Sequence, residues 1–266
     1  MNDSLADFER SEFCHGGETK TVFRRGSGPG VVLMTEVPGI SPSVATLGRV
    51  VAEAGFTVVM PDLIGVPGKE VSTPYMLRSM ARACISREFA VLSTRERSPV
   101  TEWLRALSRA LHDELGGPGI GAIGMCLTGN FALALMLDPW LQAPVLSQPS
   151  LPFGISNEHK RALHLGPGEL DVVRRRARED GVPVLGLRFT ADRLCPGERF
   201  ARLRTELGDA FEAIEIDSSR GNRHGIPRTA HSVITRDLVD AEGHPTRDAR
   251  DRVLAFLHER LGAPLS

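Results

Sequence analysis

The chain has 266 residues, of which 41% are hydrophobic and 24% are charged, and its formal net charge is −1. These values are ordinary for a globular protein with a sizeable core, and a length near 250 is common for one α/β unit. The near-zero charge supplies no global field that would attract nucleic acid or an anionic membrane. We therefore expect one domain over residues 1–266, with neither nucleic acid nor a membrane as a partner.

Targeting signals and cysteine spacing give two further expectations. No stretch reaches the ~18 apolar residues that span a bilayer, and the acidic start MNDSLADFERSEF lacks the layout of a signal peptide. A cytoplasmic location is therefore expected. The cysteines, Cys14, Cys84, Cys126 and Cys195, are far apart and form no CxxC pair. This spacing predicts reduced thiols, without a disulfide framework or a metal site.

Short apolar runs alternate with longer helical patterns, which is typical of βα units around a mostly parallel sheet. Residues 1–20 are expected to be loosely ordered. Val31–Glu36 and Thr57–Asp62 are predicted as buried strands. Between them lies an amphipathic helix that Ser41 caps and that Gly55 can end.

The middle of the chain contains the sharpest predicted change of direction. Residues 63–100 are interpreted as a lid or side wall, in which Leu63–Glu70 is a Gly/Pro loop and about Ser72 to Pro99 forms helical pieces. Thr101–Leu115 is an amphipathic helix, and Gly116 and the residues after it stop that helix. Ile120–Met125 is predicted as a strand and Phe131–Leu137 as a helix. The chain therefore turns from strand to helix within about five residues.

The last third of the chain continues the alternation. Val182–Leu187 and Phe211–Ile216 are predicted as strands, and Arg247–Leu261 as a closing helix. The arginines of residues 174–178 are interpreted as a solvated helix face. Together the pattern predicts an α/β fold with a mostly parallel central sheet and helices on both faces.

The segment Gly124-Met125-Cys126-Leu127-Thr128-Gly129 lies at the predicted strand-to-helix turn. A nucleophile elbow has this context, because a sharp turn exposes the nucleophile at the carboxyl edge of the sheet. Small residues suit such a turn, where backbone segments approach closely. The N-terminus of the following helix favours thiolate over thiol. The alternative is a structural cysteine buried at a tight turn.

Two later loop residues complete a catalytic order. Asp192 follows a predicted strand, and His231 lies between the last predicted strand and the closing helix. Nucleophile, acid and histidine in this chain order are typical of the α/β-hydrolase fold. His231 would act as general base and then as acid, while Asp192 would orient its ring. His224, in a polar run, is the rival histidine.

The arrangement resembles the dienelactone hydrolase family. The matching segments are Thr35-Glu36-Val37-Pro38-Gly39, Pro61-Asp62-Leu63, the elbow, Asp192 with Pro196, and Ala230-His231-Ser232. They span most of the chain, and their order carries more weight than any one of them. The resemblance implies a single α/β-hydrolase domain that cleaves small esters or lactones without a metal or an organic cofactor. A monomer or homodimer is expected.

The same resemblance implies individual roles. Cys126 would be the nucleophile, and Glu36 would lie near the resting thiol and help it to ionise when substrate arrives. The backbone N–H groups of Leu127 and Val37 would form the oxyanion hole, where charge develops during attack. For Glu36, the alternative is a charged residue at a strand end, solvated or paired in a salt bridge.

The sequence departs from the family at two positions. Thr128 stands at the elbow where the family usually has glycine, and a β-branched side chain there is expected to crowd the turn or reshape the pocket. Thr235 stands four residues after the histidine, where a well-known member has an arginine that binds the substrate carboxylate. Arg87 is a candidate for that role, or else a structural ion pair. The alternative function is a weakly active or inactive module for binding or redox sensing, with Cys195 as a second thiol.

Overall fold

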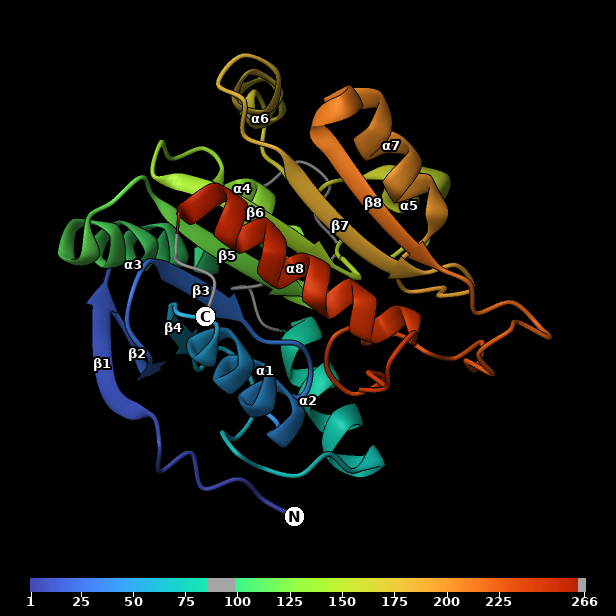
Figure 1. Cartoon of the computed structure of the whole chain (residues 1–266), viewed down its shortest axis with the longest axis horizontal. Coiled ribbons are helices and arrows are strands. Elements are labelled where there is room, and N and C mark those ends of the chain that lie inside the picture. Colours follow the sequence, from blue (N-terminus) through green and yellow to red (C-terminus); the bar gives the residue numbers. More distant parts are fainter. Residues whose placement is uncertain (86–98, 263–266) are drawn as a thin grey trace.

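The computed structural model describes residues 1–85 and 99–262, whose strands form one eight-stranded sheet in the order β1-β2-β4-β3-β5-β6-β7-β8 (Figure 1). The strands are β1 (Glu9–His15), β2 (Glu18–Arg25), β3 (Gly30–Met34), β4 (Thr57–Pro61), β5 (Ile120–Met125), β6 (Leu141–Ser147), β7 (Val184–Phe189) and β8 (Phe211–Ile216). From β4 to β8 all neighbouring strands are parallel, whereas β1 and β2 pair antiparallel at one edge. The carboxyl ends of six parallel strands therefore lie along one edge of the sheet.

Helices cover both faces of the sheet. They are α1 (Pro42–Glu53), α2 (Thr73–Ile85), α3 (Pro99–Leu115), η1 (Cys126–Thr128), α4 (Phe131–Leu135), α5 (Asn157–Arg161), α6 (Glu169–Arg178), α7 (Gly197–Leu207), η2 (Gly208–Ala210) and α8 (Pro245–Leu261). Helices α1 and α8 contribute to the hydrophobic core on one face, and they lie across the front of the sheet in Figure 1. Helices α3, α4, α6 and α7 contribute to the core on the other face.

The apolar run of β3 shows why this strand is central. Val31 and Leu33 belong to the core on the side of α1 and α8, while Val32 and Met34 belong to the opposite core. Successive side chains of a strand point to opposite faces, so a strand covered on both faces needs an unbroken apolar sequence. All four side chains are fully buried.

The predicted fold class is confirmed, and β5 and β8 have the predicted bounds. The strand predicted at Val182–Leu187 is shifted by two residues in β7. Helix α1 begins as predicted, with the Ser41 Oγ accepting a hydrogen bond from the Val44 N–H at 3.4 Å. No helix among the residues that the structure describes is long and apolar enough to cross a bilayer.

The structure differs from the sequence predictions in three places. Residues 1–20, expected to be loosely ordered, contain β1 and the start of β2, which pair along their whole length. Strand β6 was not predicted. Arg176, expected on a solvated helix face, is buried and donates hydrogen bonds to the carbonyl oxygens of Met136, Pro139 and Leu141. A guanidinium group with several donors can satisfy main-chain oxygens that would otherwise be unpaired.

The segment predicted as a lid or side wall is described only in part. Residues 63–85 lead into and form α2, and residues 99 and 100 begin α3. Residues 86–98 lie outside the described residues, and so does Arg87, the candidate carboxylate binder. The interpretation of 63–100 as a lid therefore stays a prediction.

Candidate active site

Cys126 lies at the turn between β5 and η1 and has a backbone φ of 56°. A positive φ is uncommon for a residue with a side chain and marks strain stored at the turn. The flanking glycines are required by close packing. A Cβ at Gly124 would lie 2.3 Å from the Thr128 carbonyl oxygen, and one at Gly129 would lie 2.4 Å from the Pro149 Cα. The elbow geometry that the sequence predicted is present, and Cys126 is 3% exposed.

Thr128 does not crowd the turn as the sequence suggested. Its side chain is fully buried, and its hydroxyl accepts a hydrogen bond from the Met125 N–H at 3.0 Å. Its one proton can go to one of three nearby carbonyl oxygens, those of Met125 at 3.0 Å, Met34 at 3.1 Å and Thr35 at 3.3 Å. Thr128 therefore ties the elbow to the end of β3.

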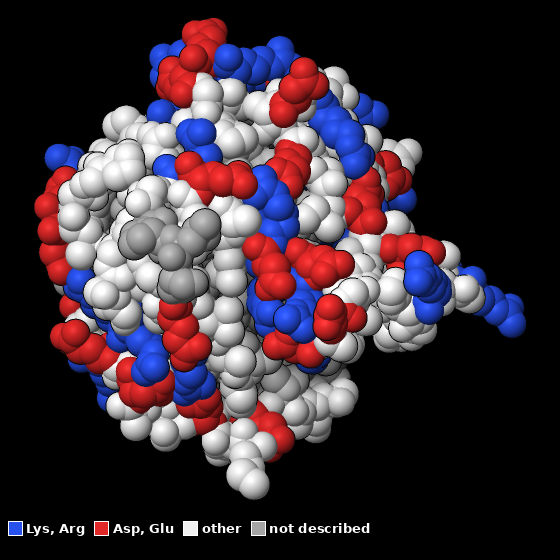
Figure 2. All heavy atoms as spheres, in the orientation of Figure 1, with Lys and Arg blue, Asp and Glu red and all other residues white. Residues whose placement is uncertain are grey.

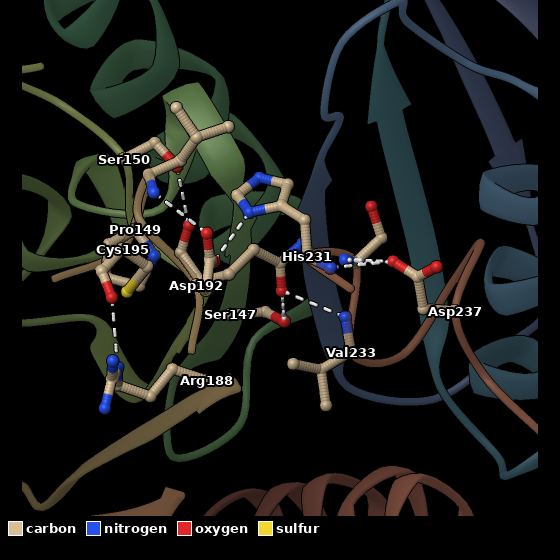
Figure 3. Close-up of polar contacts among 12 residues, drawn as sticks. Ser147, Pro149, Ser150, Arg188, Asp192, Cys195, His231, Val233 and Asp237 are labelled. Atoms are coloured by element: carbon tan, nitrogen blue, oxygen red, sulfur yellow. Dashed lines mark hydrogen bonds and ion pairs between the residues drawn. The ribbon is translucent and has the colours of Figure 1, made fainter. Parts of the chain in front are cut away.

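Asp192 and His231 form the acid–imidazole pair that their chain order predicted. The His231 Nδ1 lies 2.7 Å from the Asp192 Oδ2, as the dashed line between the two side chains shows (Figure 3). The second carboxylate oxygen accepts a hydrogen bond from the Leu194 N–H at 2.9 Å. Both side chains are buried. This bond fixes the orientation of the imidazole, as an acid partner does in a catalytic triad.

The other ring nitrogen of His231 faces the nucleophile. This Nε2 is buried and has no hydrogen-bond partner of normal geometry among the described residues. Burial lowers the pKa of His231, but negative charge at Cys126 and the hydrogen bond with Asp192 outweigh it and raise that pKa well above 6.5. The cysteine is therefore close enough to the ring to stabilise imidazolium, and imidazolium in turn stabilises a thiolate.

Asp237 holds the backbone of the histidine loop. Its Oδ2 accepts hydrogen bonds from the N–H groups of His231 and Ser232, each at 2.8 Å, and its own N–H donates to the Ser232 carbonyl oxygen at 3.0 Å (Figure 3). The sequence analysis missed this residue. The sequence does not reveal the role of Asp237, because its partners are backbone N–H groups, which are not specific to any residue type.

Glu36 is buried, 4% exposed, and has no cationic partner among the residues described. Its carboxylate accepts hydrogen bonds from Ser232 Oγ at 2.7 Å, Thr235 Oγ1 at 2.5 Å and Gln148 Nε2 at 3.1 Å. Glu36 is therefore not solvated, and no residue that the structure describes forms a salt bridge with it. In the described chain Glu36 makes no hydrogen bond to Cys126, so its predicted closeness to the thiol stays a prediction.

Gln148, directly after β6, links the elements around the site. Its backbone N–H donates to the Leu187 carbonyl oxygen at 2.7 Å, and its Oε1 accepts from the Val233 N–H at 3.3 Å. Its own φ is 35°, a second strained position at the same edge of the sheet. The sequence analysis missed Gln148 together with β6. An amide can donate and accept at once, which suits a residue that bridges a carboxylate and a backbone N–H.

Arg188 fixes the loop that carries Asp192. From the end of β7 its guanidinium donates to the Cys195 carbonyl oxygen at 3.0 Å (Figure 3). It also donates to the Thr190 carbonyl oxygen at 3.1 Å and pairs with Glu215 at 2.5 Å. Burial raises the pKa of the Cys195 thiol to about 12, so this thiol stays protonated near neutral pH. That protonation makes Cys195 a poor second thiol for a redox role.

Of the remaining predicted residues, Leu127 and Val37 lie at the site and His224 lies at the surface. The N–H groups of Leu127, beside the nucleophile, and Val37, after β3, donate no hydrogen bond to another described residue, which leaves them free for a ligand. His224 is exposed, and its ring packs edge-on against that of His244 with 5.3 Å between centroids. The structure therefore brings His231, and not His224, to the nucleophile.

The sequence matches the model of the dienelactone hydrolase family over residues 18–261. Among solved structures, a putative dienelactone hydrolase from Klebsiella pneumoniae subsp. pneumoniae is similar with a TM-score of 0.61 and 17% identity, over 95% of this chain and 98% of that one. Dienelactone hydrolase from Anabaena variabilis gives 0.61 and 14%, over 96% and 99%. A dienelactone hydrolase-like promiscuous phosphotriesterase from metagenomic libraries gives 0.58 and 16%, over 96% and 98%. No curated protein matched the sequence.

Proposed function

Since the chain belongs to the dienelactone hydrolase family, we propose that it hydrolyses a small ester or lactone through Cys126, His231 and Asp192, without a metal or an organic cofactor. The observation that carries the proposal is the 2.7 Å contact between His231 Nδ1 and Asp192 Oδ2. The other nitrogen of the same imidazole ring, Nε2, is then turned to Cys126. An oriented imidazole beside a thiol at a strained turn is the arrangement that nucleophilic catalysis needs.

The first half of the reaction forms an acyl-enzyme. The Cys126 sulfur, ionised with its proton on His231, attacks the carbonyl carbon of the substrate. Negative charge moves to the carbonyl oxygen, which the free N–H groups of Leu127 and Val37 stabilise. The intermediate then collapses, the carbon–oxygen bond to the leaving alcohol breaks, and His231 gives that alcohol its proton.

The second half regenerates the enzyme. His231, now neutral, takes a proton from a water molecule, whose oxygen attacks the thioester carbon. The sulfur leaves as thiolate, the acid product departs, and the imidazolium again faces the thiolate. Asp192 holds the ring through its Nδ1 and stabilises the charged imidazolium. Glu36 supports the loop that carries His231 through Ser232 and Thr235.

The proposal is tested by Cys126→Ala, assayed with p-nitrophenyl acetate. The variant should lose activity by at least about 10³-fold, because removal of the nucleophile of a triad leaves only the binding and the oxyanion contribution. Cys14→Ala is the matched control, since Cys14 is an exposed thiol on β1. It should retain full activity. Undiminished turnover in the purified Cys126→Ala protein would contradict the proposed mechanism.

A further inference from the structure

The N–H of Val37, one of the two proposed oxyanion donors, is oriented by a tight turn after β3. The Gly39 N–H donates to the Glu36 carbonyl oxygen at 2.6 Å, which closes the turn over residues 36–39. The Glu36 C=O and the Val37 N–H belong to one planar peptide group, in which they point in opposite directions. The hydrogen bond that holds the Glu36 carbonyl therefore also fixes the direction of the Val37 N–H.

This turn is attached to the nucleophile elbow on its N-terminal side. Strands β3 and β5 are parallel neighbours, so the segments that follow them leave the same edge of the sheet side by side. The Thr128 hydroxyl lies 3.3 Å from the Thr35 carbonyl oxygen. Val37, Cys126 and Leu127 belong to the same hydrophobic cluster. The stretch that leads to Val37 is therefore held against the elbow that carries the sulfur.

On its other side the turn packs against the loop that follows β4. A Cβ at Gly39 would overlap the Ile64 carbonyl oxygen, and one at Gly65 would overlap the Pro38 carbonyl oxygen. Both glycines have a positive φ, of 125° and 79°, which residues with a side chain rarely adopt. Main chain therefore lies directly on main chain, without room for a side chain between the two segments.

Tyr75, in the first turn of α2, is the side chain that joins these two segments. Its hydroxyl accepts a hydrogen bond from the Val66 N–H at 2.6 Å and lies 3.3 Å from the Pro38 carbonyl oxygen, to which it can donate. The Val66 carbonyl oxygen, also at 3.3 Å, is the other acceptor within reach of its proton. The Lys69 ammonium lies 4.4 Å from the centre of the ring. One hydroxyl thus links α2, the loop after β4 and the turn that carries Val37.

We propose that Tyr75 is a positioning residue for the oxyanion hole, because its hydroxyl holds the turn of residues 36–39 with the Val37 N–H directed at the substrate oxygen. It acts through the main chain of Pro38 and not on the thiol. This inference rests on the proposed function, since an oxyanion hole has a role only if Cys126 attacks a carbonyl group. A donor that is already in place stabilises the developing charge without any rearrangement during the reaction.

Tyr75→Phe tests the inference, because it removes the hydroxyl and leaves the ring. With p-nitrophenyl acetate kcat/KM should fall about tenfold, since a displaced donor loses part of the roughly 10²–10³-fold that a complete oxyanion donor contributes. Trifluoroacetophenone gives a second readout. The Cys126 thiolate adds to its carbonyl carbon, and the negative charge moves to the oxygen as in the proposed transition state. Its inhibition constant should therefore rise by a factor similar to the fall in kcat/KM.

Two further measurements distinguish a positioning role from general damage. Iodoacetamide alkylates the Cys126 sulfur by displacement of iodide, without an oxyanion. The alkylation rate of the peptide that contains Cys126, followed by mass spectrometry, should therefore be equal in the parent and in Tyr75→Phe. Lys69→Gln is the matched control, since it removes the exposed cation from the face of the same ring and leaves the hydroxyl in place. It should preserve both kcat/KM and the inhibition constant.

The outcomes separate this inference from the function on which it rests. An unchanged kcat/KM in Tyr75→Phe would overturn the positioning role, and so would a fall in kcat/KM without a matching rise in the inhibition constant. Slower alkylation of Cys126 would also overturn it, because the defect would then lie at the nucleophile. Each of these results leaves the proposed hydrolase activity intact, as long as Cys126→Ala abolishes turnover. Turnover that did not depend on Cys126 would instead remove the proposed function.

Discussion

Thr128 illustrates how one residue can depart from a family pattern and still support the site. Its branched side chain is fully buried, and its hydroxyl contacts the main chain of Met125, Met34 and Thr35. The sequence alone shows the larger side chain, but it does not show into which side of the turn that side chain points. A buried, hydrogen-bonded hydroxyl stabilises the turn, whereas a glycine at this position has no side chain that could make these hydrogen bonds.

Thr128→Val should lower the free energy of unfolding by about 1–3 kcal/mol, because the Met125 N–H loses its acceptor while the volume is unchanged. Guanidinium denaturation at fixed temperature measures this change. Thr128→Ser keeps the hydroxyl and should lose clearly less. If the valine variant were as stable as the parent, the hydrogen bonds beneath the elbow would contribute nothing measurable.

At the scale of elements, the histidine loop between β8 and α8 has no hydrogen bonds of a helix or a strand to hold its shape, so it depends on side-chain contacts. This loop runs from residue 217 to residue 244 without a helix or a strand. Asp237 closes it on itself through two backbone N–H groups, and Gln148 and Glu36 attach it to the ends of β6 and β3. The position of the imidazole therefore depends on contacts made by residues outside the proposed triad.

Asp237→Ala should reduce kcat by about tenfold or more and change KM little, because the loop would hold His231 less precisely while the binding surface stays in place. Steady-state kinetics on p-nitrophenyl acetate measures both constants. Asp217→Ala is the control in the same loop, since this exposed carboxylate accepts a hydrogen bond from the Ser219 N–H and makes no contact with the backbone of His231 or Ser232. A normal kcat for Asp237→Ala would show that the loop holds its shape without this residue.

The elements that the sequence predicted are those with unbroken apolar runs or clear caps. β3, β4, β5 and β7 are buried on both faces, and their sequences are mainly apolar. β8 is a half-buried edge strand that begins and ends with the buried Phe211 and Ile216. β1 is largely exposed and polar, and β2 is half-buried with several polar residues. The apolar run of β6 is interrupted by Gln142 and Pro144. None of these three strands therefore shows the unbroken apolar run of a buried strand. The residues Cys126, Asp192 and His231 could be chosen because the fold uses them in a fixed chain order. Asp237 and Gln148 could not, because they act on main-chain groups.

At the scale of the whole molecule, acidic and basic side chains are interspersed over the surface, without a large patch of one sign on the face shown (Figure 2). This distribution agrees with the net charge of −1. The stability of the fold should therefore depend on pH through individual half-buried groups more than through a global field. Asp62, after β4, is such a group: burial raises its pKa to about 6 from 3.8, although Lys20 and Arg10 oppose the shift.

Asp62→Asn should stabilise the protein above pH 6 and have little effect near pH 4. The folded-state pKa is raised, so the ionised carboxylate costs free energy only in the folded state, and the parent loses stability as the pH rises from about 4 to 6. Urea denaturation at pH 4 and pH 7.5 checks the sign. Asp113→Asn, at an exposed carboxylate on α3, serves as control and should change stability little at either pH. A stabilisation that was equal at the two pH values would contradict the assignment to Asp62.

The parallel order of the sheet has a consequence for synthesis on the ribosome. The thiol follows β5, near the middle of the chain, whereas the imidazole and the carboxylate that holds its loop come after β8, the last strand. A nascent chain that has released only β1 to β6 already presents the sulfur without any partner to ionise it. By the proposed mechanism, hydrolysis can begin only after the final strand has joined the edge of the sheet, because the cysteine has no imidazole beside it until then.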